Sequence, residues 1–115
     1  SSLMSEFIKR GGCKVIAVSA GAFLFLKYIA THHSPDLQVT FFSPVLVPTE
    51  EFNFHSNMVG SLRIVLGDED PVCPLHVAKA FNDVFEGSTL RVIEKAGHHL
   101  PHDVVSEEII DLMEI

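Results

Sequence analysis

The segment Lys14–Lys27, KVIAVSAGAFLFLK, constrains the fold of this chain more than any other part of the sequence. It contains a short apolar run, a serine flanked by small residues, and a longer apolar stretch. The short run is typical of a buried strand and the longer stretch of a buried helix. We therefore expect a strand over Lys14–Val18, a sharp turn at Ser19 and a helix over Ala20–His32.

Apolar strands and amphipathic helices alternate along the rest of the chain. Further strands are expected over Leu37–Phe42, Leu62–Leu66 and Leu90–Ile93, and further helices over Leu3–Lys9, Leu75–Phe85 and Val104–Met113. Near-continuous apolar strands that alternate with helices indicate a parallel sheet with helices on both faces. The sequence thus predicts one α/β domain over residues 1–115, with a parallel sheet of about four strands.

Two of the later strands end in residues that could act together with Ser19. The acidic turn GDEDPVCP (67–74) follows the expected strand Leu62–Leu66, and the sequence AGHH (96–99) follows the expected strand Leu90–Ile93. The carboxyl ends of parallel strands meet at one edge of a sheet, which is where sites form in such folds. We therefore expect the serine, an acid and a histidine to meet at this edge.

The acid and the histidine each have competitors in the neighbouring sequence. Asp70 competes with Asp68 and Glu69, and is favoured because a proline follows it directly. In the same way, His98 competes with His99.

Ser19 has two interpretations. As the residue before a helix, it fits a helix N-cap, for which serine is preferred. On a sharp strand-to-helix turn, its hydroxyl would instead project from the packed layers and could attack a carbonyl, provided that an imidazole takes its proton.

These motifs, in this order along the chain, resemble the α/β-hydrolase family. The resemblance includes the small residues around the serine, at Ala17 and Gly21. It implies Ser19 as the nucleophile, His98 as the general base and then acid, and Asp70 as the residue that orients the imidazole. It also implies an oxyanion hydrogen bond from the backbone N–H of Ala20.

The resemblance covers the chain from Lys14 onward and implies the carboxyl-terminal half of the family's fold. The strands and the second oxyanion donor that the family places before the elbow have no counterpart in Ser1–Cys13. It implies a serine hydrolase of esterase or thioesterase type that acts on a small carboxylic ester through an acyl-enzyme, without a cofactor. We expect a homo-oligomer, or a complex with a chain that supplies the missing strands. The alternative is a catalytically inactive, hydrolase-like interaction domain.

The segment Ser43–Gly60 joins two expected strands and contains Phe52, Phe54 and Met58. In the family, this position often carries a lid. Here the segment has room for about one short helix or an ordered loop. Its apolar residues either line an acyl pocket or pack over an exposed edge.

The charge of the chain disfavours several classes of partner. The formal net charge is −7, and Lys and Arg are not clustered. Nucleic acids and anionic membranes reward clusters of these cations, so neither is expected as a partner. The apolar run Ala20–Leu26 is also too short to span a bilayer. Cys13 and Cys73 are far apart and no signal peptide is evident, so a reduced, cytoplasmic protein is expected.

Seven histidines raise the question of a metal site. His98, His99 and His102 lie close together, but their spacing, with Pro101 between, is not that of a typical zinc site. No metal is expected. Cys73 lies in the acidic turn rather than at an elbow, so it is not expected to be a nucleophile.

Overall fold

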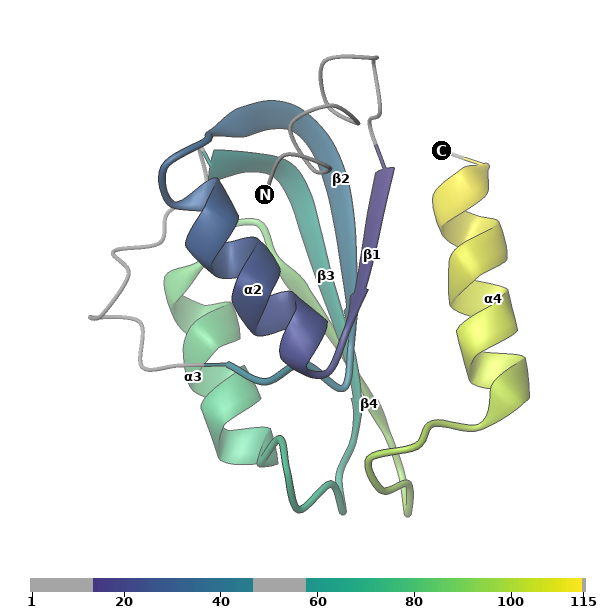
Figure 1. Ribbon diagram of the computed structural model, residues 1–115. Coiled ribbons are helices and arrows are strands. Elements are labelled where there is room, and N and C mark those ends of the chain that lie inside the picture. Colours follow the sequence, from purple (N-terminus) through teal and green to yellow (C-terminus); the bar gives the residue numbers. More distant parts are fainter. Residues whose placement is uncertain (1–13, 47–57, 115) are drawn as a thin grey trace.

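The computed structural model describes residues 14–46 and 58–114, which form a parallel sheet with helices packed against it (Figure 1). The elements are β1 (Lys14–Val18), α2 (Ala20–Ile29), β2 (Ser34–Phe42), β3 (Val59–Gly67), α3 (Leu75–Val84), β4 (Thr89–Ile93) and α4 (His102–Met113). The strand order is β1-β2-β3-β4, and every neighbouring pair is parallel. The predicted parallel sheet of about four strands is therefore confirmed.

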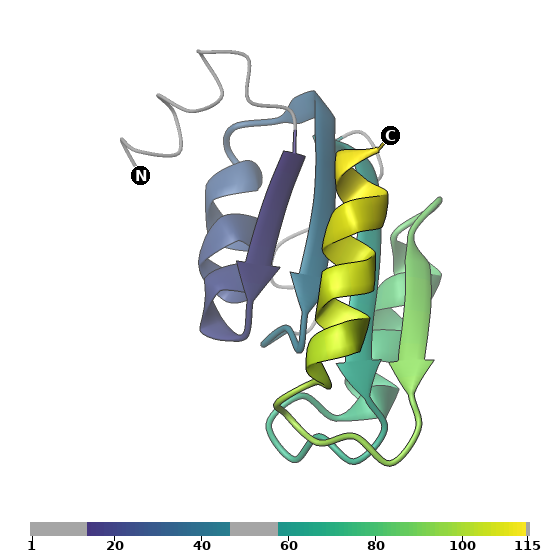
Figure 2. The ribbon, with the colours of Figure 1, turned by 90° about the vertical axis from the view of Figure 1, so that its right-hand side faces the viewer.

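Helices cover both faces of the sheet, as the sequence predicts. α2 and α3 lie on one face and α4 on the other, which two perpendicular views make clear (Figure 1, Figure 2). Phe25 of α2 meets Phe41 of β2 edge to face, with ring centroids 6.1 Å apart, inside the core between α2, α3 and the sheet. None of the helices in the described part of the chain is long and apolar enough to cross a membrane.

Two strands begin three residues earlier than expected. β2 begins at Ser34 rather than Leu37, and β3 begins at Val59 rather than Leu62. The additional residues include polar and exposed ones, and the pairing between the strands is irregular from Ser34 to Gln38. Backbone hydrogen bonding extends these strands beyond their apolar stretches, so hydrophobicity alone could not reveal their starts.

α2 ends at Ile29, three residues before the predicted end at His32. Both the backbone N–H and the hydroxyl of Thr31 donate to the carbonyl of Tyr28, which closes the helix with a turn. The expected helix Leu3–Lys9, and Phe52 and Phe54 of the expected lid segment, lie outside the described residues.

Of the three apolar residues named above for the segment Ser43–Gly60, only Met58 lies in the part of the chain that the structure describes. Its side chain is 1% exposed and belongs to the core cluster just before β3. Met58 is therefore a core residue and does not line an open acyl pocket.

A buried carboxylate holds α4 against the sheet. The side chain of Glu108 is only 2% exposed, and it accepts hydrogen bonds from Arg63 of β3 and Arg91 of β4. The hydrogen bond from Arg63 lowers the pKa of Glu108 below its ordinary value, against the opposing effect of burial. The resulting charge pairing fixes α4 across two strands of the sheet.

Replacing this carboxylate should loosen α4. We expect Glu108→Gln to lower the free energy of unfolding at neutral pH by about 1 to 3 kcal/mol, because two arginines lose a charged acceptor. A group with a lowered pKa stabilises the fold above its ordinary pKa and loses that contribution as the pH falls. The difference between wild type and variant, measured by urea unfolding, should therefore shrink below about pH 4.5.

Glu107→Gln is the matched control for this experiment. The neighbouring Glu107 is 60% exposed and lies 3.3 Å from Arg91 at the surface. Its substitution should leave the unfolding midpoint almost unchanged, since exposed ion pairs contribute little. Equal effects of the two substitutions would contradict the anchoring role of Glu108.

Candidate active site

Ser19 occupies the sharp turn that the sequence predicts between β1 and α2. Its backbone has φ 53° and ψ −121°, a conformation that non-glycine residues rarely adopt. The Ser19 N–H donates to the carbonyl of Phe42 at 3.0 Å, and the N–H of Val45 donates to the Ser19 carbonyl at 3.0 Å. Such a conformation costs about 1 to 3 kcal/mol and persists only where the surroundings fix it, as these two bonds do.

The Ser19 hydroxyl points to a histidine and does not cap the helix. Ser19 stands at the N-cap position of α2, but its side chain makes no cap hydrogen bond. Instead, its Oγ lies 2.9 Å from Nε2 of His98. Of the two interpretations of this serine, the geometry favours the one that pairs it with an imidazole.

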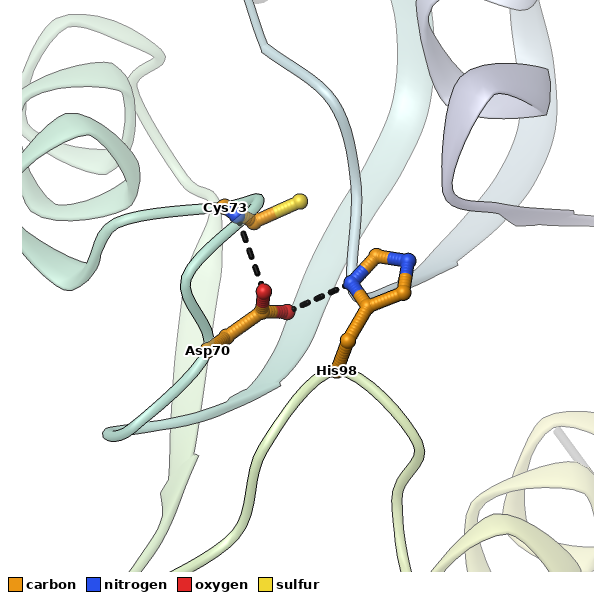
Figure 3. A group of neighbouring side chains, drawn as sticks. All are labelled: Asp70, Cys73 and His98. Carbon is orange, nitrogen blue, oxygen red and sulfur yellow. Dashed lines mark hydrogen bonds and ion pairs between the residues drawn. The ribbon is translucent and has the colours of Figure 1, made fainter.

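His98 links Ser19 to Asp70. Nδ1 of His98 lies 2.8 Å from Oδ2 of Asp70, and Figure 3 shows the second ring nitrogen on the side of the ring away from that carboxylate. An ionised carboxylate can only accept, so Nδ1 carries the proton and Nε2 is free to accept the hydrogen bond of the Ser19 hydroxyl. The structure thus brings the three residues singled out in the sequence into one hydrogen-bonded chain.

Asp70 is held in its ionised form. Its side chain is fully buried, and its Oδ1 accepts hydrogen bonds from the backbone N–H groups of Val72 at 2.8 Å and Cys73 at 2.9 Å. Burial by itself would raise the pKa of Asp70, but the hydrogen bonds from Cys73, His98 and Val72 together lower it below its ordinary value. The carboxylate therefore keeps its charge at neutral pH.

The two competing acids, Asp68 and Glu69, do not contact the imidazole of His98. Asp68 is exposed and its Oδ1 accepts a hydrogen bond from the backbone N–H of Lys95 at 2.8 Å. Glu69 is also exposed, and its backbone N–H donates to the carbonyl of Ala96 at 2.9 Å. Both residues join the acidic turn to the histidine turn, and only Asp70 contacts the imidazole of His98.

The competing histidine is exposed. The ring of His99 stands edge-on to that of His98, with centroids 5.8 Å apart. Among the described residues, His98 is the histidine that pairs with both Ser19 and Asp70.

A glycine allows the acidic turn and the histidine turn to touch. A Cβ atom built on Gly67 would lie 2.1 Å from the carbonyl oxygen of Ala96, far inside any permitted contact. At Gly21, in contrast, an added Cβ would meet nothing within 4 Å. The glycine that the site needs for steric reasons is thus Gly67, which begins the GDED motif, rather than Gly21 of the elbow.

Ala20 is the first residue of α2, as the oxyanion hypothesis requires. The first N–H groups of a helix have no partner within the helix, and they lie at the positive end of its dipole. The N–H of Ala20 directly follows the serine that carries the hydroxyl, so its position suits a developing negative charge near Ser19.

Two further residues contribute to the site, and sequence analysis did not identify them in this role. Ser43 follows β2 and donates through its hydroxyl to the backbone carbonyl of His98 at 2.7 Å. Cys73 donates through its thiol to the carbonyl of Ser43 at 3.1 Å. The position of Ser43 directly after an apolar strand of the parallel sheet was the available signal, since that also places it at the carboxyl edge.

Asp70, Cys73 and His98 are the one group of three described residues whose donor atoms lie close enough to share a metal ion (Figure 3). The three histidines that lie close together in the sequence, His98, His99 and His102, do not form such a group among the described residues. Burial, with a further contribution from the charge of Asp70, raises the pKa of the Cys73 thiol to about 12. The sulfur therefore stays protonated, which suits its hydrogen bond to Ser43 and not metal ligation or nucleophilic attack.

Comparison with known proteins gives matches in structure and not in sequence. No family model matches the sequence, and no curated protein matches it significantly. The predicted CIB-like hydrolase of Thermoplasma acidophilum matches with a TM-score of 0.75 and 19% identity over 99% of this chain. An α/β serine hydrolase homologue from Coxiella burnetii matches with a TM-score of 0.71 and 20% identity over 99% of this chain.

The chain has the α/β-hydrolase fold. It spans only about half the length of these solved structures, 58% of the first and 55% of the second. The monoacylglycerol lipase of Paleococcus ferrophilus shares the hydrolase fold as well, with a TM-score of 0.75, 11% identity, and coverage of 96% of this chain and 72% of the lipase. At these identities the likeness describes the fold, and the geometry of this chain's own side chains carries any argument about chemistry.

The contact at Gly67 can be tested by adding one methyl group. We expect Gly67→Ala to displace the acidic turn from the histidine turn, because the new Cβ cannot coexist with the carbonyl of Ala96. The unfolding free energy should fall by about 1 to 3 kcal/mol. The control is Gly97→Ala in the neighbouring turn, where an added Cβ meets nothing within 4 Å and little change is expected. Equal urea midpoints for Gly67→Ala and wild type would contradict the proposed contact.

Proposed function

We propose that this chain carries the catalytic triad of a serine hydrolase that cleaves a small carboxylic ester or thioester through an acyl-enzyme. The observation that carries the proposal is the hydrogen-bonded chain from Ser19 Oγ through the ring of His98 to Asp70, with the serine on a strained turn at a helix N-terminus. A helix cap or a surface serine would require none of these features.

The proposed reaction begins with attack by Oγ of Ser19 on the ester carbonyl. Nε2 of His98 accepts the hydroxyl proton as the new C–O bond forms, and then donates it to the departing alcohol or thiol as the acyl-enzyme forms. Water next attacks the acyl group. It gives a proton to the same nitrogen, which returns it to Ser19 as the carboxylic acid leaves.

Asp70 supports the proposed proton transfers through its charge and its fixed position. His98 becomes an imidazolium in each transition state, and the adjacent carboxylate stabilises that cation. The lowered pKa of Asp70 means that this charge is present throughout the neutral pH range. The hydrogen bonds from the backbone of Val72 and Cys73 keep the carboxylate aimed at Nδ1.

Ala20 is the proposed donor to the oxyanion. Its N–H follows the nucleophile directly at the start of α2, where the helix dipole also favours negative charge. Hydrolases of this fold use a second backbone donor, which we propose comes from polypeptide that packs beside β1.

An ester substrate is the simplest choice for this geometry. The monoacylglycerol lipase of Paleococcus ferrophilus shares the fold, and its name describes an ester hydrolase. Alcohols and thiols are better leaving groups than amines, so a site with one identified oxyanion donor is better suited to esters and thioesters than to amides.

We also propose that a strand from a second copy of this chain pairs with the outer edge of β1. β1 lies at one end of the described sheet, and its Ile16 and Val18 are 43% and 57% exposed. A groove of about 260 Å³ lies between β1 and α2, with Leu24 at its side. An apolar parallel edge of this kind favours pairing with another strand.

Covalent labelling with a fluorophosphonate probe tests the triad. Wild type should be labelled once, on Ser19, as intact mass and peptide mapping would show. Ser19→Ala and His98→Ala should abolish labelling, and Asp70→Asn should slow it on the order of 1,000-fold or more. His99→Ala is the matched control. His99 is an exposed neighbour of His98 outside the proposed triad, so this variant should be labelled at the wild-type rate. A folded wild type that stays unlabelled would refute the proposed activity and favour the interaction-domain alternative.

Light scattering with size-exclusion chromatography tests the edge pairing. Wild type at micromolar concentration should elute with a mass above that of one chain. Val18→Lys should return it to the monomeric mass, since a lysine on an edge strand opposes strand addition. Val92→Lys, on the opposite edge strand β4 and 39% exposed in wild type, should leave the mass unchanged. A monomeric wild type would contradict the pairing.

A further inference from the structure

The segment Phe42–Val45, at the end of β2, contacts all three turns of the candidate active site. Phe42 and Val45 hold the elbow through the two backbone bonds to Ser19, each 3.0 Å long. Between them lies Ser43, which is 2% exposed. Ser43 reaches the other two turns, so a segment of four residues joins the nucleophile, the acid turn and the histidine turn.

Three hydrogen bonds converge on Ser43. Its N–H donates to the carbonyl of Val65 in β3 at 2.9 Å, which fixes the residue to the sheet. Its carbonyl accepts the thiol of Cys73, three residues after Asp70. Its hydroxyl donates to the carbonyl of His98 at 2.7 Å, the shortest of the three.

The backbone of Ser43 is strained, as is that of Ser19. Its φ is 47°, in the left-handed region that non-glycine residues avoid. Glycine would adopt this conformation without steric cost. A serine at this position therefore loses stability relative to glycine, and what it gains is a hydroxyl directed at the histidine turn.

We infer that Ser43 is a positioning residue that sets the orientation of the His98 imidazole toward Ser19 and Asp70. Gly97, directly before His98, allows that turn many conformations, and a Cβ at Gly97 would meet no neighbour within 4 Å. The hydroxyl of Ser43 fixes the carbonyl on the other side of His98. With the backbone held there, the ring can span its two partners at 2.9 and 2.8 Å.

The expected effect of Ser43 on the labelling rate rests on the proposed function. Its expected effect on the His98 imidazole does not. A displacement of about 1 Å in a reacting group costs up to about 100-fold in rate. Loss of the hydroxyl should therefore slow fluorophosphonate labelling of Ser19 by about 10- to 100-fold. The tautomer of His98 should change as well, whether or not the protein is active, because Nδ1–H no longer meets Asp70 in a fixed geometry.

Two variants separate the hydroxyl from the backbone strain. Ser43→Ala removes the hydroxyl and keeps a side chain at positive φ, whereas Ser43→Gly removes the hydroxyl and relieves the strain. Ser88→Ala is the control, because Ser88 is a partly buried serine whose hydroxyl bonds to Asn82 and not to a residue of the site. Each variant is labelled with the probe. Its His98 ring is also examined by ¹⁵N NMR, with urea unfolding as the measure of stability.

The expected result is that both Ser43 variants label slowly and that their His98 signals move from the Nδ1–H tautomer toward a mixture. Ser88→Ala should lose stability without either change. Wild-type labelling rates and wild-type His98 signals in both Ser43 variants would overturn the inference. So would a normal rate in Ser43→Gly alone, because strain and not the hydroxyl would then be the cause. If wild type itself is not labelled, the proposed function fails, and the His98 signals alone decide the role of Ser43.

Discussion

The contact between the turns that follow β3 and β4 is the constraint on which the candidate site depends. Gly67 has no side chain, so the carbonyl of Ala96 can approach its Cα closely. The side chain of Asp68 and the backbone of Glu69 then bond to the histidine turn across the junction. Asp70 and His98 can meet at 2.8 Å because these contacts hold the two turns together.

Backbone strain in the described part of the chain is concentrated around the same edge of the sheet. Its three non-glycine residues with positive φ are Ser19, Ser43 and Lys95, which lie in the turns after β1, β2 and β4. Each is held by hydrogen bonds to a neighbouring turn or strand. Strained residues persist where the surroundings over-determine them, and such places are often functional sites. The distribution of strain thus agrees with the position of the proposed triad and of Ser43.

The other end of the molecule is organised by charge rather than by strain. Glu108 forms ion pairs with Arg63 and Arg91, which hold α4 against β3 and β4. α4 begins at His102, four residues after His98. The histidine turn is therefore held at both of its ends, by the sheet through β4 and by the anchored helix. At β1, in contrast, exposed apolar side chains mark the edge where we propose that further polypeptide packs.

The sequence was sufficient to predict the α/β class, the parallel sheet, the helices on both faces and the sharp turn at Ser19. These depend on local patterns, namely apolar runs of strand or helix length and a serine between small residues. Because Asp70 and His98 each come shortly after an expected strand, the sequence also placed them at the same edge of the sheet as Ser19. Element ends were less predictable, because exposed backbone pairing extends β2 and β3 beyond their apolar stretches.

The sequence by itself determined which kinds of residue could act, and the tertiary structure decided between them. Asp68, Glu69 and Asp70 are neighbouring carboxylates, and the sequence favours Asp70 only through the proline that follows it. Only folding buries Asp70 among donors and directs the other two to solvent and to the neighbouring turn. The need for Gly67 and the role of Ser43 likewise exist only across strands distant in the chain, since a steric clash or a hydrogen bond depends on which atoms meet in space.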